Sequence, residues 1–127
     1  MQTSTNQTGQ YTFTIIVPVY NEEDNIARLE EKLSNYLPQS LYKTCVLFVN
    51  DGSTDDSGSR IHQMCDRHPG FFYIEMKRNG GLSAALKAGF DYCFSEYVGY
   101  MDADMQTDAD DFNLLLPGLA NCEFVTG

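Results

Sequence analysis

The stretch TFTIIVPVYNE, residues 12–22, decides the fold of this chain. Its first nine residues are mostly β-branched, apolar or aromatic, a continuous pattern typical of a strand that is buried on both faces of a sheet. The segment Asn21–Asn25 follows and contains three acids, which favour the start of a helix. Apolar residues then recur at helical spacing from Ile26 to Leu37, and Pro38 ends the helix. This stretch therefore predicts a buried parallel strand followed by a helix.

The same alternation continues along the rest of the chain. Further strands are predicted at 45–49, 71–76, 97–101 and 123–126. Further helices are predicted over 82–90 and 108–119, and another starts at the turn 50–57 and ends near 68–70. One strand and one helix recur about every 25–30 residues, which is typical of βαβ units. The expected fold class is therefore α/β, a mostly parallel sheet with helices on both sides.

The length of 127 residues allows one domain. Residues 1–11 are polar and are expected to form a flexible N-terminal tail, so the predicted domain covers 12–127. The chain stops on a strand-like segment directly after an acidic helical segment. We therefore expect a truncated domain.

Composition and charge exclude several classes of protein. With 43% hydrophobic and 20% charged residues, the chain has the composition of a soluble globular protein. No apolar run is long enough to predict a membrane span, and the first residues do not resemble a secretory signal. The net charge is −10, and residues 91–127 contain eight acids but no Lys or Arg. Nucleic acid is therefore not an expected partner, because binding phosphates requires a basic face.

The four cysteines and two histidines do not form a familiar metal motif. No C-x-x-C pair is present, so a zinc site of the usual spacing is not predicted. Each cysteine lies in or beside an apolar stretch. We therefore expect buried, reduced thiols and a cytoplasmic location.

Polar clusters follow each of the first four predicted strands. They lie at 18–22, 50–54, 77–81 and 102–106. The carboxyl ends of parallel strands meet at one edge of a sheet, where ligands bind in folds of this class. The four clusters therefore predict one binding site.

Asp102, Asp104 and Gln106 are the candidate metal ligands. Alternate residues leaving a strand can direct two carboxylates at one ion, and Gln106 adds an oxygen at the next alternate position. Hard cations such as Mg²⁺ and Mn²⁺ prefer such oxygen ligands. The alternative is a solvated acidic turn, or a helix cap that uses Asp108.

The other clusters suggest contacts with a nucleotide. Asp51 could accept hydrogen bonds from a base or a ribose, and Tyr20 could stack on a base whose edge Glu22 contacts. Arg78 and the bare N–H groups of Gly80–Gly81 could bind a phosphate. The structural alternatives are ordinary turns and helix starts with capping side chains.

Four motifs, in order and spacing, resemble the family 2 glycosyltransferases, which have the GT-A (Rossmann-like) fold. They are IVPVYNEEDNI at 16–26, VNDGSTDDS at 49–57, RNGGLSAALKAG at 78–89 and YMDADMQ at 100–106. The DADMQ segment further resembles the branch that includes dolichol-phosphate mannose synthases and related polyprenyl-phosphate glycosyltransferases. After the Gln, that branch usually has Asp-Pro-Pro-Glu, whereas this chain has TDADD at 107–111.

The resemblance implies metal-dependent binding of a nucleotide-diphosphate sugar, of the UDP, GDP or dTDP type, and inverting transfer to an acceptor. The acceptor would be a polyprenyl phosphate, another lipid or a growing polysaccharide, as in lipid or cell-envelope glycosylation. The implied nucleotide-binding residues are Pro18, Tyr20, Glu22, Asp51, Arg78 and Asp102. The implied ligands of Mg²⁺ or Mn²⁺ are Asp102, Asp104 and Gln106.

Domains of this family are roughly twice as long as this chain, so the resemblance covers the donor-binding half. The catalytic base and the acceptor site would lie in the other half, and we expect the chain alone to transfer no sugar. Membrane association through a missing C-terminal part would place the full protein at the cytoplasmic face of a membrane.

Two other functions remain open at this point. A nucleotidyltransferase also uses a parallel sheet, paired acids and a metal, but it normally has a basic glycine-rich loop where this chain has PVYNE at 18–22. A non-catalytic, Mg²⁺-binding signalling module would need acids directly after the first strand and a late Lys, and no Lys or Arg follows Lys87. Metal-dependent binding of a nucleoside diphosphate would distinguish the two enzymes from the signalling module.

Overall fold

The computed structural model describes residues 2–3, 8–40, 42–101 and 103 of the chain. The elements in chain order are β1 (Gln2–Thr3), η1 (Thr8–Gln10), β2 (Phe13–Val19), η2 (Glu23–Asn25), α1 (Ile26–Tyr36), η3 (Leu37–Gln39), β3 (Thr44–Asn50), α2 (Ser57–Arg67), β4 (Phe71–Glu75), α3 (Leu82–Tyr92) and β5 (Tyr97–Tyr100). The predicted helix at 108–119 and the predicted strand at 123–126 lie outside the described residues.

The described strands form one sheet in the order β1-β4-β3-β2-β5. β2 pairs in parallel with both β3 and β5, and β3 pairs in parallel with β4. The short β1 is antiparallel to β4. The prediction of a mostly parallel α/β sheet is therefore confirmed.

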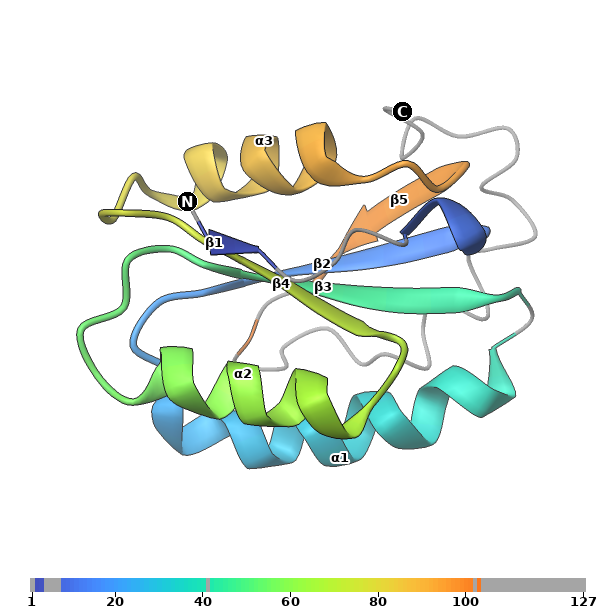
Figure 1. The fold of residues 1–127 in the computed structure, drawn as a ribbon, viewed down its shortest axis with the longest axis horizontal. Helices are drawn as coiled ribbons and strands as arrows, with labels where there is room; N and C mark the ends of the chain where they lie inside the picture. Colours follow the sequence, from blue (N-terminus) through green and yellow to red (C-terminus); the bar gives the residue numbers. More distant parts are fainter. Residues whose placement is uncertain (1, 4–7, 41, 102, 104–127) are drawn as a thin grey trace.

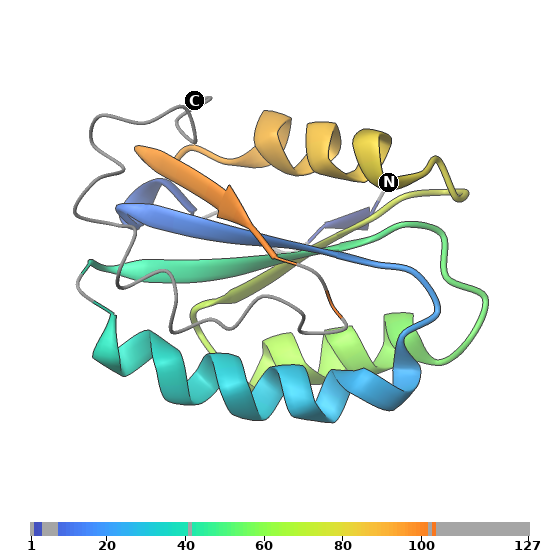
Figure 2. The same cartoon turned by 180° about the vertical axis from the view of Figure 1, so that it is seen from behind.

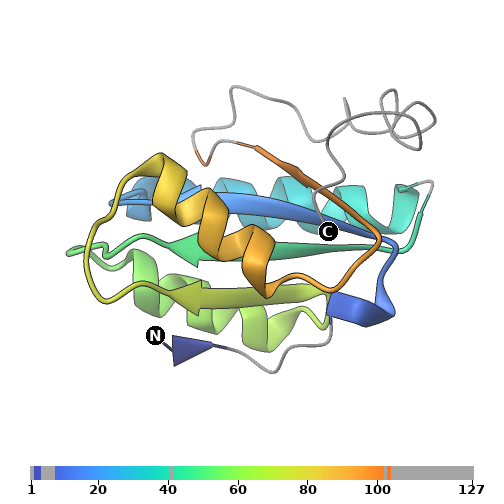
Figure 3. The same cartoon turned by 90° about the horizontal axis from the view of Figure 1, so that it is seen from above.

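Helices cover both faces of this sheet. Figures 1 and 2 show α1 and α2 together on one face and α3 on the other, and Figure 3 shows α3 lying across the strands. Along β2, Phe13, Ile15 and Val17 belong to the core on the α1 and α2 side, whereas Ile16 belongs to the core under α3. This explains the unbroken apolar run, because both faces of the strand are buried. No helix among the described residues is both long and apolar enough to cross a bilayer.

The N-terminal residues contribute contacts that the sequence pattern did not suggest. Thr8, within the expected tail at 1–11, is fully buried, and its hydroxyl accepts a hydrogen bond of 3.0 Å from the Phe94 backbone N–H. The Tyr11 N–H donates to the Thr8 carbonyl at 3.0 Å, and the Tyr11 ring packs edge-on against Phe72. Thr8 and Tyr11 therefore pack against the domain, and the described pair Gln2–Thr3 joins the sheet as β1.

Candidate functional site

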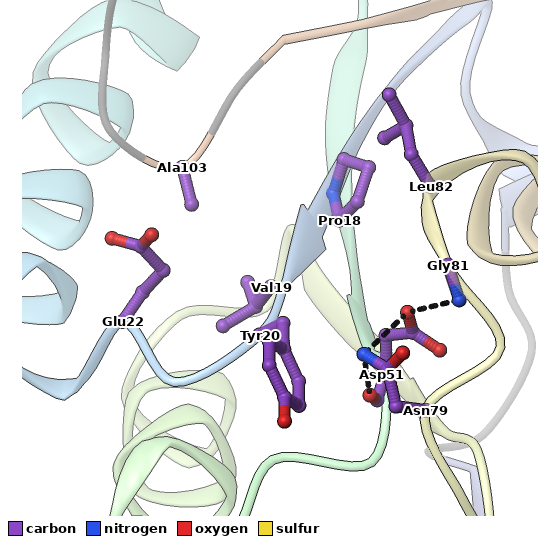
Figure 4. Close-up of a pocket in the computed structure, with 9 residues that line it drawn as sticks. All are labelled: Pro18, Val19, Tyr20, Glu22, Asp51, Asn79, Gly81, Leu82 and Ala103. Carbon is purple, nitrogen blue, oxygen red and sulfur yellow. Dashed lines mark hydrogen bonds between the residues drawn. The ribbon is translucent and has the colours of Figure 1, made fainter.

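The position of β2 defines where a ligand would bind. β2 has β3 on one side and β5 on the other, so the strand order reverses here. In open parallel sheets, the crevice outside the carboxyl ends of the strands at such a reversal is the usual ligand site. A pocket of about 380 Å³ lies at this edge (Figure 4). Its lining residues are Pro18, Val19, Tyr20, Glu22, Asp51, Asn79, Gly81, Leu82 and Ala103.

Four of the residues predicted from the sequence to bind nucleotide meet in this pocket. They are Pro18, Tyr20, Glu22 and Asp51, which come from the ends of β2 and β3 (Figure 4). Arg78 is exposed and does not line the pocket. The convergence was predicted from the strand ends, whereas the binding roles of these residues stay predictions.

The predicted metal ligands Asp102, Asp104 and Gln106 lie outside the described residues. Ala103, which stands between the first two in the sequence, is described and lines the pocket. Within the part of the chain that the structure describes, no group of three or more His, Cys, Asp or Glu gathers to hold a metal ion. The metal site therefore stays a prediction from the sequence.

The Asp51 carboxylate is held by the loop that precedes α3. Oδ1 accepts a hydrogen bond from the Gly80 N–H at 2.9 Å, and Oδ2 accepts one from the Gly81 N–H at 3.0 Å. The Asn79 side-chain amide donates to both the carbonyl oxygen and Oδ2 of Asp51, at 3.2 Å each. Asp51 is only 4% exposed. It therefore joins the end of β3 to the start of α3, in addition to lining the pocket.

Gly52 allows these two loops to touch. Its φ of 71° lies in the left-handed region, which favours glycine. A Cβ at this position would lie 2.4 Å from the Asn79 backbone N and 2.9 Å from the Arg78 Cα. The turn after β3 and the loop before α3 therefore meet backbone to backbone, and this contact brings Asn79 to Asp51.

The pocket combines apolar walls with carboxylate oxygens. The Tyr20 side chain is 46% exposed at the pocket, and Pro18 and Leu82 supply apolar surface. The Glu22 Oε2 accepts a hydrogen bond of 2.6 Å from the Asn25 side-chain amide, which orients that carboxylate. None of the nine lining residues is basic. This arrangement suits a planar group that presents N–H or O–H donors at its edge.

Four lining residues were given no individual role by sequence reasoning. They are Val19, Asn79, Leu82 and Ala103, which line the pocket beside the predicted residues. For Asn79, the position directly before two glycines could have indicated a structural role. An asparagine side chain in such a loop commonly forms hydrogen bonds with nearby backbone groups. No signal marked Val19, Leu82 and Ala103 beyond their positions next to predicted site residues.

A second hollow, of about 470 Å³, lies between α2 and the end of β4. Its lining includes His62, Glu75 and Lys77. The His62 Nε2 lies 2.7 Å from the Glu75 Oε1, and the imidazole stacks on the Tyr73 ring with a centroid distance of 4.2 Å. These contacts place His62 of α2 against β4.

Comparison with known proteins identifies the family. The model for glycosyl transferase family 2 matches residues 14–125. A dolichyl-phosphate beta-glucosyltransferase of Trichomonas vaginalis is 33% identical over 111 residues, which cover 84% of this chain and 34% of that protein. An undecaprenyl-phosphate 4-deoxy-4-formamido-L-arabinose transferase of Pseudomonas savastanoi pv. phaseolicola is 31% identical over 104 residues, covering 81% of this chain and 31% of that protein.

A solved structure gives the same assignment. The mannosyltransferase PcManGT of Pyrobaculum calidifontis, in complex with GDP-Man and Mn²⁺, has a TM-score of 0.62 and 32% identity, covering 74% of this chain and 28% of that one. The expected GT-A fold is therefore confirmed. The chain spans about a third of the length of the relatives that it matches. It belongs to glycosyl transferase family 2.

Proposed function

We propose that this chain is the donor-binding part of a metal-dependent sugar transferase and that it binds a nucleotide-diphosphate sugar at the carboxyl ends of β2 and β3. The observation that supports this proposal best is the convergence of Pro18, Tyr20, Glu22 and Asp51 around one pocket. This pocket lies at the reversal of strand order, where an α/β sheet offers its ligand crevice.

Three pocket residues and Arg78 have proposed contacts with the nucleotide. The Tyr20 ring stacks on the base, since the ring is exposed at the pocket and aromatic faces favour such contacts. Asp51 retains carboxylate acceptor capacity beyond its bonds to the loop, and it accepts from the base or the ribose. Glu22, oriented by Asn25, accepts a further hydrogen bond. Arg78 lies on an exposed loop and contacts the phosphates.

The proposed metal is Mg²⁺ or Mn²⁺, held by Asp102, Asp104 and Gln106. Two carboxylates and an amide oxygen are suitable ligands for these hard cations, and Ala103 on the pocket wall lies between the two acids in sequence. When bound, the metal would neutralise charge on the diphosphate leaving group. The Mn²⁺ and GDP-Man in the mannosyltransferase structure support this choice.

For the whole protein, we propose inverting transfer of the sugar to a lipid phosphate or a glycan. Names of two relatives specify dolichyl phosphate and undecaprenyl phosphate, which supports a lipid-phosphate acceptor. The acceptor site and the catalytic base are assigned to parts beyond this chain, which we expect to transfer no sugar alone. A cytoplasmic location is proposed because the described cysteines are free thiols.

A thermal-shift titration tests the donor site. The chain is heated with UDP, GDP, CDP or dTDP, in the presence of Mn²⁺ or of EDTA. A nucleotide present at about 100 times its Kd adds about 2.7 kcal/mol of stability, a shift of several degrees in Tm for a domain of this size. We expect one nucleotide to raise Tm with Mn²⁺ and to lose most of this effect with EDTA.

Three variants locate the effect. Glu22→Gln is expected to reduce the nucleotide-dependent shift in Tm, because it removes a carboxylate that lines the pocket. Glu22 is only partly buried, so the variant should still fold. Asp104→Asn is expected to reduce the dependence on Mn²⁺. Glu31→Gln, on the exposed surface of α1, is the matched control and should behave as the wild type. A folded wild-type chain whose Tm responds to none of the four nucleotides would contradict the proposal.

A further inference from the structure

The loop after β2 is fastened to the loop after β3 by a row of hydrogen bonds. Three successive backbone N–H groups of the first loop donate to side chains of the second. The pairs are Asn21 N–H to Ser53 Oγ at 3.0 Å, Glu22 N–H to Ser57 Oγ at 2.9 Å, and Glu23 N–H to Asp55 Oδ2 at 3.3 Å. The acceptor Ser57 is fully buried. These bonds fix the backbone of Asn21–Glu23 relative to the turn that begins at Asp51.

Asn21 differs from its neighbours in conformation and in direction. Its φ of 53° makes it the non-glycine residue with positive φ among those that the structure describes. Its side-chain Oδ1 accepts hydrogen bonds from the Thr54 N–H at 2.8 Å and from the Thr54 hydroxyl at 3.4 Å. Tyr20 and Glu22, on either side of it, line the pocket, whereas Asn21 does not.

A left-handed backbone at a residue with a Cβ is unfavourable, and it persists when surrounding contacts hold it. Asparagine tolerates this conformation better than most residues. Here the contacts come from Ser53 and Thr54, in the loop that also contains Asp51. The turn at Asn21 therefore sets the directions of Tyr20 and Glu22. The Asn21 side chain bonds this turn to the loop after β3, which contains Asp51.

We propose that Asn21 is a positioning residue for nucleotide binding. It acts through Tyr20 and Glu22 and does not itself contact the nucleotide. The inference rests on the proposed function of the pocket, because it assigns Asn21 a role in that same site.

Two substitutions separate the backbone role from the side-chain role. Asn21→Gly retains the freedom to adopt positive φ and loses the acceptor for Thr54, whereas Asn21→Ala loses both. The probe is the nucleoside diphosphate, among UDP, GDP, CDP and dTDP, that raises the wild-type Tm most with Mn²⁺. We expect Kd to rise about threefold to fivefold for Asn21→Gly and by about tenfold or more for Asn21→Ala.

Kd is measured well below the Tm of each variant, so that every sample is folded. Under this condition a merely structural role would lower Tm and leave Kd unchanged. Ser34→Ala, which removes a hydroxyl that bonds within α1, is the matched control and should retain the wild-type Kd. Amide hydrogen exchange without nucleotide adds a second readout, in which Asn21→Ala should speed exchange at Glu22, Glu23 and Thr54 but not within β2 or β3.

The outcomes distinguish this inference from the proposed function. If the wild type binds a nucleotide and Asn21→Ala retains its Kd within twofold, the positioning role is wrong and the donor site stands. If the folded wild type binds none of the four nucleotides, the proposed function is wrong and the positioning role falls with it. A graded rise in Kd from wild type to Asn21→Gly to Asn21→Ala supports both the donor site and the positioning role of Asn21.

Discussion

At the scale of single residues, Asp51 uses the same two carboxylate oxygens for a structural task and for its proposed contact with a ligand. Its two carboxylate oxygens accept the N–H groups of Gly80 and Gly81 and the amide of Asn79. These donors lie directly before α3, whose N-cap residue, Gly81, has no side chain with which to cap the helix. The carboxylate therefore stabilises the start of a helix from across the pocket, and the same bonds hold it in place for a ligand.

Asp51→Asn tests the structural task without nucleotide. The substitution replaces one acceptor oxygen by an NH₂ group, which then faces a backbone N–H of Gly80 or Gly81. Because two donors cannot bond to each other, we expect the free energy of unfolding to fall by about 1–3 kcal/mol. Urea denaturation followed by circular dichroism measures this loss.

The control for this prediction is Asp91→Asn. Asp91 lies on the exposed side of α3, where its carboxylate pairs with Lys87 one turn away at 2.9 Å, and such exposed pairs contribute little. If Asp51→Asn and Asp91→Asn have equal urea midpoints, the carboxylate does not hold the loop before α3.

The candidate site could be predicted from the sequence where it depends on strand ends. Glu22 and Asp51 each stand two residues after an apolar run, and the ends of parallel strands must meet at one edge, so their convergence needed no knowledge of packing. That Arg78 lies outside the pocket lining could not be predicted in the same way, because its loop is placed by a tertiary contact with Gly52. The sequence pattern placed Asn21 at the start of a helix. Its left-handed backbone could not be predicted, because the contacts that hold it come from Ser53 and Thr54, more than 30 residues away.

At the scale of elements, the packing of α3 on β2 depends on the missing side chain of Gly89. A Cβ at Gly89 would lie 2.9 Å from both the Cδ1 and the Cγ2 of Ile16, which is fully buried. Glycine destabilises a helix interior by about 1 kcal/mol relative to alanine. Its presence at position 89 is explained by the lack of space for a Cβ beside Ile16. The helix can approach the strand closely because residue 89 has no side chain.

Gly89→Ala is expected to lower the free energy of unfolding by about 1 kcal/mol. Overpacking a core costs about 1–3 kcal/mol, and the gain in helix propensity offsets about 1 kcal/mol of this. Urea denaturation measures the difference. In the background of Ile16→Val, which removes the Cδ1, the cost should shrink. A double-mutant cycle with no coupling between positions 16 and 89 would show that the close approach is not what the substitution disturbs.

Among the described residues, the bounds of β2 to β5, α1 and α3 could be predicted to within one or two residues, because unbroken apolar runs and helical spacing are strong signals. The predicted strand at 45–49 is observed as β3, Thr44–Asn50, and the predicted strand at 71–76 as β4, Phe71–Glu75. β1 was missed because two polar residues have no periodicity to detect. Its pairing with β4 depends on tertiary contact, which the local sequence does not encode.

At the scale of the whole molecule, the sheet separates two cores, and described cysteines lie within one of them and against the other. Cys45 lies in the core under α3, and Cys65 packs against the core under α1 and α2. Burial raises the pKa of each of these thiols to about 12. The folded chain therefore retains protons that the unfolded chain releases above about pH 8.5, so stability should decline as the pH rises from there toward 12.

Alkylation of these two thiols tests whether the layers unfold together. Both have a similarly raised pKa, but Cys45 is fully buried whereas Cys65 is only partly buried. At pH 8 without urea, iodoacetamide should therefore modify Cys65 faster than Cys45, as measured by mass spectrometry of the separate peptides.

Because β3 lies in the middle of the sheet, exposing Cys45 requires the layer of α3 to leave it. We expect Cys45 to be modified only over the urea range in which the helical circular dichroism signal is lost. Modification of Cys45 at lower urea would mean that α3 opens as a separate unit, and the donor pocket, whose wall includes the start of that helix, would then open with it.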